Sequence, residues 1–279
     1  MPKVLKIVLS ALFVLAVAFF TAKGCVQFYK EVKGTHPARI RAIVRSVVKK
    51  IPAAPGAGAK EAKMAIILDD WGLNRTLLKE AIEIGRPLTL SVLPNLLYSR
   101  EIAENAKKNG LGVMLHLPMQ AQSLKAATEP HTILTTMPDA EIVEYMDEAL
   151  ASVPGAEGVN NHQGSAATSD PRVMETVLKH LKSKGLFFVD SHVVATTVGA
   201  KVAKSLGVPF TSRDVFIDNQ PTVEAVKEEL RKAGEKALSS GRIVVIGHDK
   251  KPTLDAIREM APELERNGVK LVLVKELLE

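Results

Sequence analysis

Short apolar runs that end in acidic or histidine residues constrain this chain more than any other feature. The run at residues 65–68 leads directly into Asp69 and Asp70. Similar runs lead into His116, Asp190 and His248. A strand buried on both faces reads as a continuous apolar stretch, and polar side chains at the carboxyl ends of parallel strands line the active face of α/β proteins. The sequence therefore predicts a parallel sheet with a functional site along one edge.

From residue 64 onward, apolar runs alternate with segments of helical periodicity. The helical segments carry apolar residues three and four positions apart, as at residues 142–150 and 173–181. This alternation predicts a parallel sheet, and eight candidate strands favour a barrel over an open sheet. The candidate strands are residues 65–68, 88–93, 112–115, 158–159, 186–189, 208–211, 243–246 and 269–274.

Charge is distributed unevenly along the chain. The formal net charge is +6, but residues 1–63 hold 12 Lys or Arg against two Asp or Glu, which leaves 25 against 29 in residues 64–279. A nucleic-acid-binding domain would concentrate Lys and Arg on the folded part itself. We therefore expect no nucleic-acid partner. Residues 64–279 are long enough to form one large α/β domain.

The first 24 residues have the pattern of a membrane-targeting element. Lys3 and Lys6 precede an apolar stretch at residues 7–22, and Lys23 closes it. About 16 apolar residues are long for the core of a signal peptide and slightly short for a spanning helix. We favour an uncleaved signal anchor that inserts the N-terminus into the lipid bilayer. A cleaved signal peptide is the alternative.

Residues 25–63 are expected to be a basic stalk followed by a linker. Residues 36–50 intersperse basic and apolar side chains, which suits an amphipathic helix on anionic lipid and a solvated stalk equally well. Residues 51–59 are rich in proline, alanine and glycine, a linker composition. We expect a membrane-anchored protein whose domain faces the periplasm or the cell exterior. Basic residues flank the apolar stretch on both sides, so the positive-inside rule does not by itself give this orientation.

Asp69 and Asp70 are the first candidates for chemistry. Successive side chains leaving a strand point in different directions, so one carboxylate can bind a metal while the other reaches a water. His116 follows its own apolar run, and His162 lies in a polar segment, residues 160–165, that is expected to be a turn. One carboxylate and two imidazoles compose a typical catalytic site for a divalent metal. We predict that Asp70, His116 and His162 hold such an ion, with zinc favoured.

Other polar residues near strand ends are candidates for supporting roles. His248 is either a third histidine ligand or the acid that protonates a leaving group, and we favour the acid. Asp190 suits a carboxylate that orients a histidine. Arg213 and Asp218 follow the strand predicted at residues 208–211, where they form either a salt-bridged loop or a contact with substrate or anion.

Six short motifs follow one another along the chain. They are Ile67-Leu68-Asp69-Asp70, His116-Leu117-Pro118-Met119, Asn160-Asn161-His162-Gln163-Gly164-Ser165, Asp190-Ser191, Arg213-Asp214-Val215-Phe216-Ile217-Asp218 and Ile246-Gly247-His248. In this order they resemble the divergent polysaccharide deacetylases, a branch of the carbohydrate esterases with the NodB-type fold. The resemblance covers roughly residues 64–277. It implies a distorted (β/α) barrel of about seven to eight parallel strands, a divalent metal, and hydrolysis of N- or O-acetyl groups on a glycan.

The resemblance also implies roles for individual residues. Asp69 resembles the catalytic base of the family, Asp70 its metal-binding aspartate, and His116 its first metal histidine. His248 resembles its catalytic acid. The remaining expected positions support these groups or contact the substrate. They are Asn161, Asp190, Arg213 and Asp218.

The chain departs from the family pattern at the second metal histidine. Ordinary members carry it four residues after the first, where this chain has Gln120, and the usual arginine-proline-tyrosine signature is also missing. His162 is expected to take its place. We expect a metal-dependent hydrolase that deacetylates an envelope glycan. The alternative is a membrane-tethered glycan-binding or scaffold protein that kept the fold and the metal with little catalysis.

Overall fold

The computed structural model describes residues 61–123, 129 and 131–279. All of them belong to one of the two units into which the chain divides, Ala54–Glu279. The predicted signal anchor, stalk and linker lie outside the described residues, apart from the last three positions of the linker region. None of the helices in this described part combines the length and the apolarity needed to cross a bilayer.

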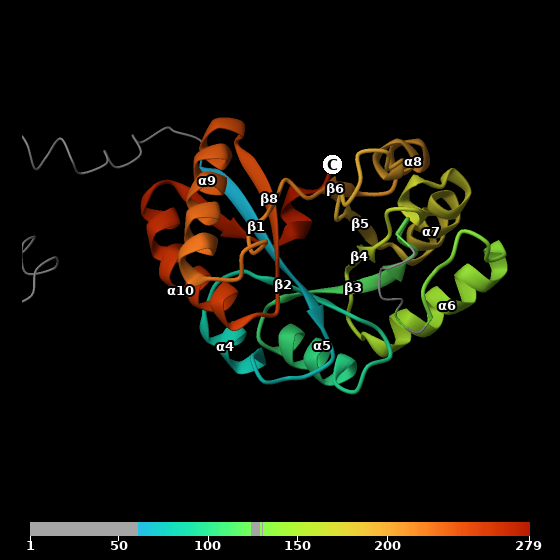
Figure 1. Cartoon of the computed structure of the whole chain (residues 1–279), viewed down its shortest axis with the longest axis horizontal. Coiled ribbons are helices and arrows are strands. Elements are labelled where there is room, and N and C mark those ends of the chain that lie inside the picture. Colours follow the sequence, from blue (N-terminus) through green and yellow to red (C-terminus); the bar gives the residue numbers. More distant parts are fainter. Residues whose placement is uncertain (1–60, 124–128, 130) are drawn as a thin grey trace, which may run out of the picture. The chain divides into compact units, whose positions relative to one another are not determined.

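Nine strands of the described residues form one sheet in which the paired strands are parallel (Figure 1). Their order along the sheet is β6-β5-β4-β3-β2-β1-β8-β7, and β9 pairs with the first part of β1. The strands are β1 (Ala62–Trp71), β2 (Thr89–Val92), β3 (Gly112–Met119), β4 (Gly158–Gln163), β5 (Phe187–Asp190), β6 (Phe210–Ser212), β7 (Val215–Phe216), β8 (Arg242–His248) and β9 (Val269–Val272).

The sheet is a half-barrel, whereas the sequence predicted a barrel of seven to eight strands. The parallel α/β class is confirmed, but β6 and β7 stand at opposite ends of the sheet order. Only Arg213 and Asp214 connect these two strands. The backbone N–H of Arg213 donates to Asp190 on β5, and that of Asp214 donates to Val244 on β8. The two ends of the sheet are therefore joined by the chain between β6 and β7, and not by a ladder of hydrogen bonds between these two strands.

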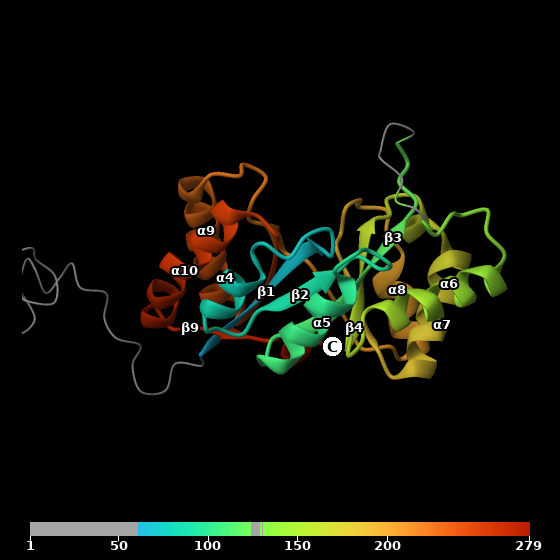
Figure 2. The same ribbon diagram turned by 90° about the horizontal axis from the view of Figure 1, so that it is seen from below.

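Helices cover the outside of the curved sheet. Figure 1 shows α9 and α10 beside β1 and β8, and Figure 2 shows α5 along β2. Several helices end at a left-handed glycine, as α7 does at Gly185. The helices are α4 (Leu78–Glu83), α5 (Ser99–Lys108), α6 (Asp139–Ser152), α7 (Pro171–Lys184), α8 (Gly199–Leu206), α9 (Val223–Ser240) and α10 (Lys251–Arg266), with short 3-10 turns at Ala167–Ser169 and Val274–Leu277.

Side chains on the two faces of the sheet enter two different cores. On β1, Ile66 and Leu68 pack among the helices, while Ala65 and Ile67 pack in a smaller cluster inside the half-barrel. That inner cluster also includes Val274 and Leu277 of the last 3-10 turn. Burial of both faces explains why the β1 sequence is continuously apolar.

The side chains that face the inside of the half-barrel are apolar along most of each strand and become polar at its carboxyl end. Inward-facing residues alternate along each strand, so Asp69 follows Ile67, and the β1–β8 ladder places Asp69 opposite His248. The β3–β4 ladder places His116 opposite Asn160. The carboxyl ends of β1, β3, β4 and β8 therefore carry a polar layer above the apolar filling.

Several strands, β1, β3 and β4 among them, extend beyond the apolar runs that predicted them. β1 continues to Trp71, β3 includes His116 and ends at Met119, and β4 includes the 160–163 segment that was expected to be a turn. The β3–β4 ladder continues to the pair Met119 and Gln163. Strand pairing persists where the inward side chains have become polar, so apolar runs underestimate the strand lengths.

Candidate metal centre and catalytic site

A bulge in β1 turns both acids toward the site. The register of β1 against β2 shifts between Leu68 and Trp71, and Asp70 has the left-handed φ of 68°. In a regular strand, successive side chains point to opposite faces. Here His116 Nε2 lies 3.3 Å from Asp70 Oδ1 and 3.7 Å from Asp69 Oδ2. The kink therefore delivers two adjacent carboxylates to one imidazole.

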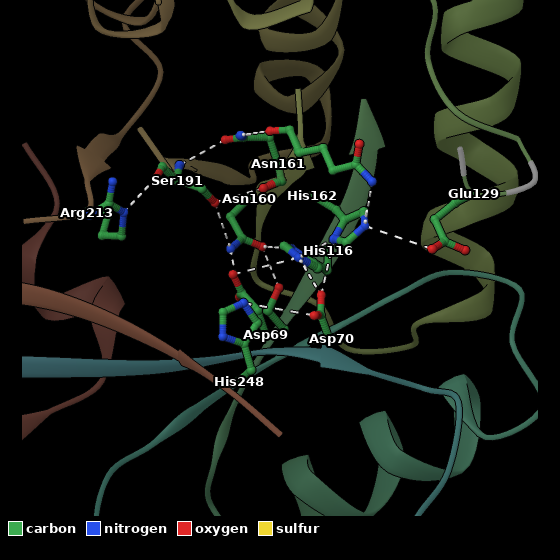
Figure 3. A network of polar contacts seen from close by, with 12 residues as sticks. Asp69, Asp70, His116, Glu129, Asn160, Asn161, His162, Ser191, Arg213 and His248 are labelled. Atoms are coloured by element: carbon green, nitrogen blue, oxygen red, sulfur yellow. Dashed lines mark hydrogen bonds and ion pairs between the residues drawn. The ribbon is translucent and has the colours of Figure 1, made fainter. Parts of the chain in front are cut away.

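Asp70, His116 and His162, from β1, β3 and β4, converge on a small triangle of ligand atoms (Figure 3). Asp70 Oδ1 lies 3.1 Å from His162 Nδ1, and His162 Nδ1 lies 3.1 Å from His116 Nε2. The third side is the 3.3 Å separation between His116 and Asp70. The structure thus brings together the three residues predicted from the sequence.

The triangle has the dimensions of a divalent-metal site. A tetrahedral zinc ion about 2.0–2.1 Å from each nitrogen and oxygen ligand separates those ligands by roughly 3.3–3.4 Å. Asp70 Oδ1 is buried without a hydrogen-bond partner in the described part of the chain, so a lone pair is free for a cation. The ligand set of one carboxylate and two imidazoles fits zinc or a similar ion.

The charges of the site also favour a cation. Burial alone would raise the pKa of Asp70, but the close imidazoles of His116 and His162 hold it well below its usual range. Burial alone would lower the pKa of His116, but the Asp69 charge and the Asp70 contact raise it to about 9. Two carboxylates within 4 Å of His116 therefore stabilise one positive charge at this point.

Asp69 lies beside the triangle and has the environment of a base. The residue is 3% exposed, and burial raises the pKa of its carboxyl group. Its Oδ1 accepts a hydrogen bond of 2.9 Å from Asn160 Nδ2. A desolvated carboxylate is a stronger proton acceptor than an exposed one.

His248 approaches the same site from β8. Its Nε2 lies 3.9 Å from Asp70 Oδ2, while its Nδ1 lies 2.8 Å from Asp218 Oδ1. The other oxygen of Asp218 accepts from the His248 backbone and from Thr253 Oγ1. Burial alone would lower the pKa of His248, but the Asp218 carboxylate raises it. Asp218 therefore orients His248 and favours its protonated form.

Asp190 and Arg213, which the sequence suggested as supporting groups, both contact the loop after β5. Asp190 accepts hydrogen bonds from His192 N at 2.7 Å and Thr197 Oγ1 at 2.6 Å. Asp218, and not Asp190, contacts the ring of His248. Arg213 donates to the carbonyls of Ser191 and His192 at 2.7 and 2.8 Å, so its guanidinium holds the loop after β5.

Two polar side chains next to the ligands organise their surroundings. Asn161 accepts from Ser191 N at 2.9 Å and donates to the Gln163 carbonyl at 2.7 Å. Gln120, at the position of the missing metal histidine, accepts from Thr135 N at 2.7 Å and Thr135 Oγ1 at 2.9 Å. Gln120 therefore ties down the loop after β3, and His162 supplies the second imidazole from the next strand.

Three functional candidates were missed by the sequence interpretation. Asn160 and Ser91 are fully buried and hydrogen-bond to each other, and Asn160 also contacts His116. Asp249 lies beside His248, and burial together with the Asp70 charge raises its pKa to about 7. The sequence held a signal for Ser91, a polar residue inside the strand predicted at residues 88–93, and for Asn160, which stands two positions before His162 in the same motif.

Solved structures share this parallel half-barrel at low sequence identity. The structure resembles that of ATU2773, a protein from Agrobacterium tumefaciens C58, with a TM-score of 0.74 at 22% identity over 80% of this chain and 92% of that one. It also resembles a mutant with restored activity of BA3943, a CE4 pseudoenzyme from Bacillus anthracis. There the TM-score is 0.53 at 15% identity, over 79% of this chain and 69% of that one.

Sequence comparison defines the family. The chain belongs to the divergent polysaccharide deacetylase family, whose model matches residues 66–278. YibQ of Escherichia coli (strain K12) is 31% identical over 216 residues, which are 77% of this chain and 67% of YibQ. A Haemophilus influenzae protein is 30% identical over 198 residues, which are 71% of this chain and 70% of that protein.

Proposed function

We propose that this protein is a metal-dependent hydrolase that removes acetyl groups from a glycan of the cell envelope. One arrangement carries the proposal: the ligand triangle lies beside both a buried carboxylate with a raised pKa, Asp69, and an imidazole with a raised pKa, His248. A base and an acid next to a cation site suit the hydrolysis of an amide or an ester. The family adds the expectation of an acetylated polysaccharide as substrate.

Each of these residues has its own role in the proposed reaction. Asp70, His116 and His162 would hold the ion, which when bound supplies a Lewis acid for an acetyl carbonyl and lowers the pKa of water. Asp69 takes the proton from the attacking water. His248, held by Asp218, gives a proton to the departing sugar nitrogen or oxygen. The products are acetate and the free amine or alcohol.

The side chains of the site differ in their exposure to solvent. The side chains of Asp70, His248 and His162 are 35%, 27% and 18% exposed, whereas those of His116 and Asp69 are 3% and 4% exposed. A substrate therefore reaches the acid and the outer ligand edge, while the base works from the buried floor. This geometry supports attack by a water held between Asp69 and the substrate.

The direct test measures acetate released by the full chain loaded with zinc. Chitooligosaccharides, peptidoglycan fragments and O-acetylated xylan are suitable substrates because they separate amide from ester hydrolysis. We expect Asp69→Asn to keep zinc and lose at least about a hundredfold of turnover, the usual contribution of a general base. His116→Ala should lose both zinc and turnover. An Asp69→Asn protein as fast as wild type would rule out Asp69 as the base.

A glycan-binding or scaffold protein is the second candidate. Its support is that Gln120 replaces the usual metal histidine and that a CE4 pseudoenzyme has a similar fold. In this case zinc would bind but acetate would not be released. A glycan-affinity measurement that gives the same value for wild type and Asp69→Asn, without turnover by either, would favour this candidate over the hydrolase.

The location of the domain is a proposal from the sequence alone. An apolar stretch at residues 7–22, followed by a basic stalk, supports a membrane anchor with the domain in the periplasm or outside the cell. The measurement is protease access to the domain in intact cells and in spheroplasts or permeabilised cells. Digestion only after the inner membrane is broken would contradict the proposal.

A further inference from the structure

Asn160 is the centre of a buried hydrogen-bond network behind the ligand triangle. It is 0% exposed and lies opposite His116 in the β3–β4 ladder. Its Oδ1 accepts a hydrogen bond from Ser91 Oγ and lies 2.9 Å from His116 Nδ1. Its Nδ2 lies 2.9 Å from Asp69 Oδ1 and 3.3 Å from Ser191 Oγ. One side-chain amide thus touches a metal-ligand candidate and the candidate base.

The orientation of this amide follows from its neighbours. The single hydroxyl proton of Ser191 is donated to the Asn161 carbonyl, at 2.8 Å. Ser191 Oγ can therefore only accept from Asn160. Asp69 is also an acceptor when ionised. Both contacts require the NH2 group of Asn160 on this side, so its carbonyl oxygen must face His116.

That orientation determines which ring nitrogen of His116 carries a proton. The Asn160 carbonyl oxygen is an acceptor only, so His116 Nδ1 must be the donor. The neutral imidazole then has its lone pair on Nε2, the atom that lies 3.3 Å from Asp70 Oδ1 and 3.1 Å from His162 Nδ1. A hydrogen bond at the second nitrogen is the usual way in which proteins orient a metal-ligating histidine.

We propose that Asn160 is a positioning residue with two partners. Its carbonyl oxygen keeps the proton of His116 on Nδ1 and so directs Nε2 to the cation, while its NH2 group orients Asp69. The Asn161 backbone carbonyl sets the direction of the whole network through Ser191. The proposal rests on the metal site of the proposed function, but it requires no particular glycan.

Three variants of the full chain separate these roles. Asn160→Leu keeps the branching and the number of side-chain heavy atoms and removes every hydrogen bond of the amide, whereas Asn160→Asp retains an acceptor toward His116. Ser99→Ala is the control, because it removes another buried hydroxyl, which bonds to the Leu93 carbonyl and the Leu96 N–H and to none of the three ligands. Zinc affinity is measured by competition with a chelating dye, and the thermal midpoint is measured for each variant.

We expect Asn160→Leu to bind zinc about 10- to 100-fold more weakly than wild type, as is usual when an outer partner of a ligand is removed. Asn160→Asp should stay within about tenfold of wild type, and Ser99→Ala should bind zinc normally. Unchanged zinc affinity in Asn160→Leu would overturn the proposal. Equal weakening in the Leu and Asp variants would overturn it too, because it would indicate general damage to the fold.

A measurement on the wild type does not depend on the variants folding. In the zinc-loaded full chain, 15N NMR of the His116 ring should show a proton on Nδ1 that exchanges slowly with water, and zinc on Nε2. Zinc on Nδ1 would overturn the proposal. None of these measurements uses a glycan, so the proposed deacetylation can fail while the role of Asn160 stands, and the reverse.

Discussion

His116 Nε2 and His162 Nδ1 lie 3.1 Å apart, although they come from neighbouring strands and each has another partner at its second nitrogen. Two imidazole lone pairs at this distance repel unless a proton or a cation lies between them. Asp70 Oδ1 completes the group within 3.3 Å of both. The raised pKa of His116 supplies that proton in the metal-free protein, and a bound cation would take its place.

His162 and Gln120 should differ in their effect on zinc. His162→Ala removes a ligand and should weaken zinc binding by at least about a hundredfold, more than the loss of an outer partner. Gln120→Ala removes two hydrogen bonds to Thr135 and should cost about 1 kcal/mol of stability with zinc affinity unchanged. Isothermal titration and thermal melting measure both quantities. A larger loss of zinc in Gln120→Ala would mean that Gln120 takes part in binding.

Zinc binding should depend on pH because it competes with a proton. The pKa of His116 in the metal-free protein is raised to about 9, so this ring is protonated at neutral pH. Zinc must displace that proton, and the apparent affinity should therefore rise with pH up to about 9 and fall as much as tenfold per unit below it. Calorimetry in buffers of different ionisation enthalpy should find about one proton released at pH 7. Affinity that is constant between pH 6 and 8 would contradict this assignment.

Asp218 should affect turnover and leave zinc in place. Asp218→Asn keeps the shape but removes the charge that raises the pKa of His248. We expect kcat to fall by at least about a hundredfold, the size of a general-acid contribution, with unchanged zinc affinity. Asp190→Asn is the comparison, since Asp190 accepts hydrogen bonds from its own loop. A larger loss of kcat in Asp190→Asn would reverse the roles of the two carboxylates.

Gly158 should tolerate no side chain at the start of β4. A Cβ there would lie 2.2 Å from the Phe187 ring on β5. We expect Gly158→Ala to destabilise the fold by about 1–3 kcal/mol, the usual cost of overpacking. Chemical denaturation measures this value, and Phe187→Leu in the same chain should recover part of it. If the double variant lost as much stability as the two single variants together, the two positions would not clash.

Most of the strands and site residues that could be predicted were found from the apolar runs. β1 and β8 are buried on both faces, so the apolar runs within them are continuous, and the first polar residue after each run marks the polar layer. That rule located Asp69, His116 and His248. His162 was located only as a companion of these residues, because the polar segment around it read as a turn although it is a strand.

The contacts between distant residues were decided by tertiary structure. The β1 bulge brings Asp69 and Asp70 to one side, and no local pattern encodes it. Asp218 reaches His248, 30 positions away, while Asp190 turns back to its own loop. Asn160 connects His116 to Asp69 because the ladder pairs it with His116. Alternation along one strand determines which face a side chain occupies, but only the register between strands determines which side chains meet.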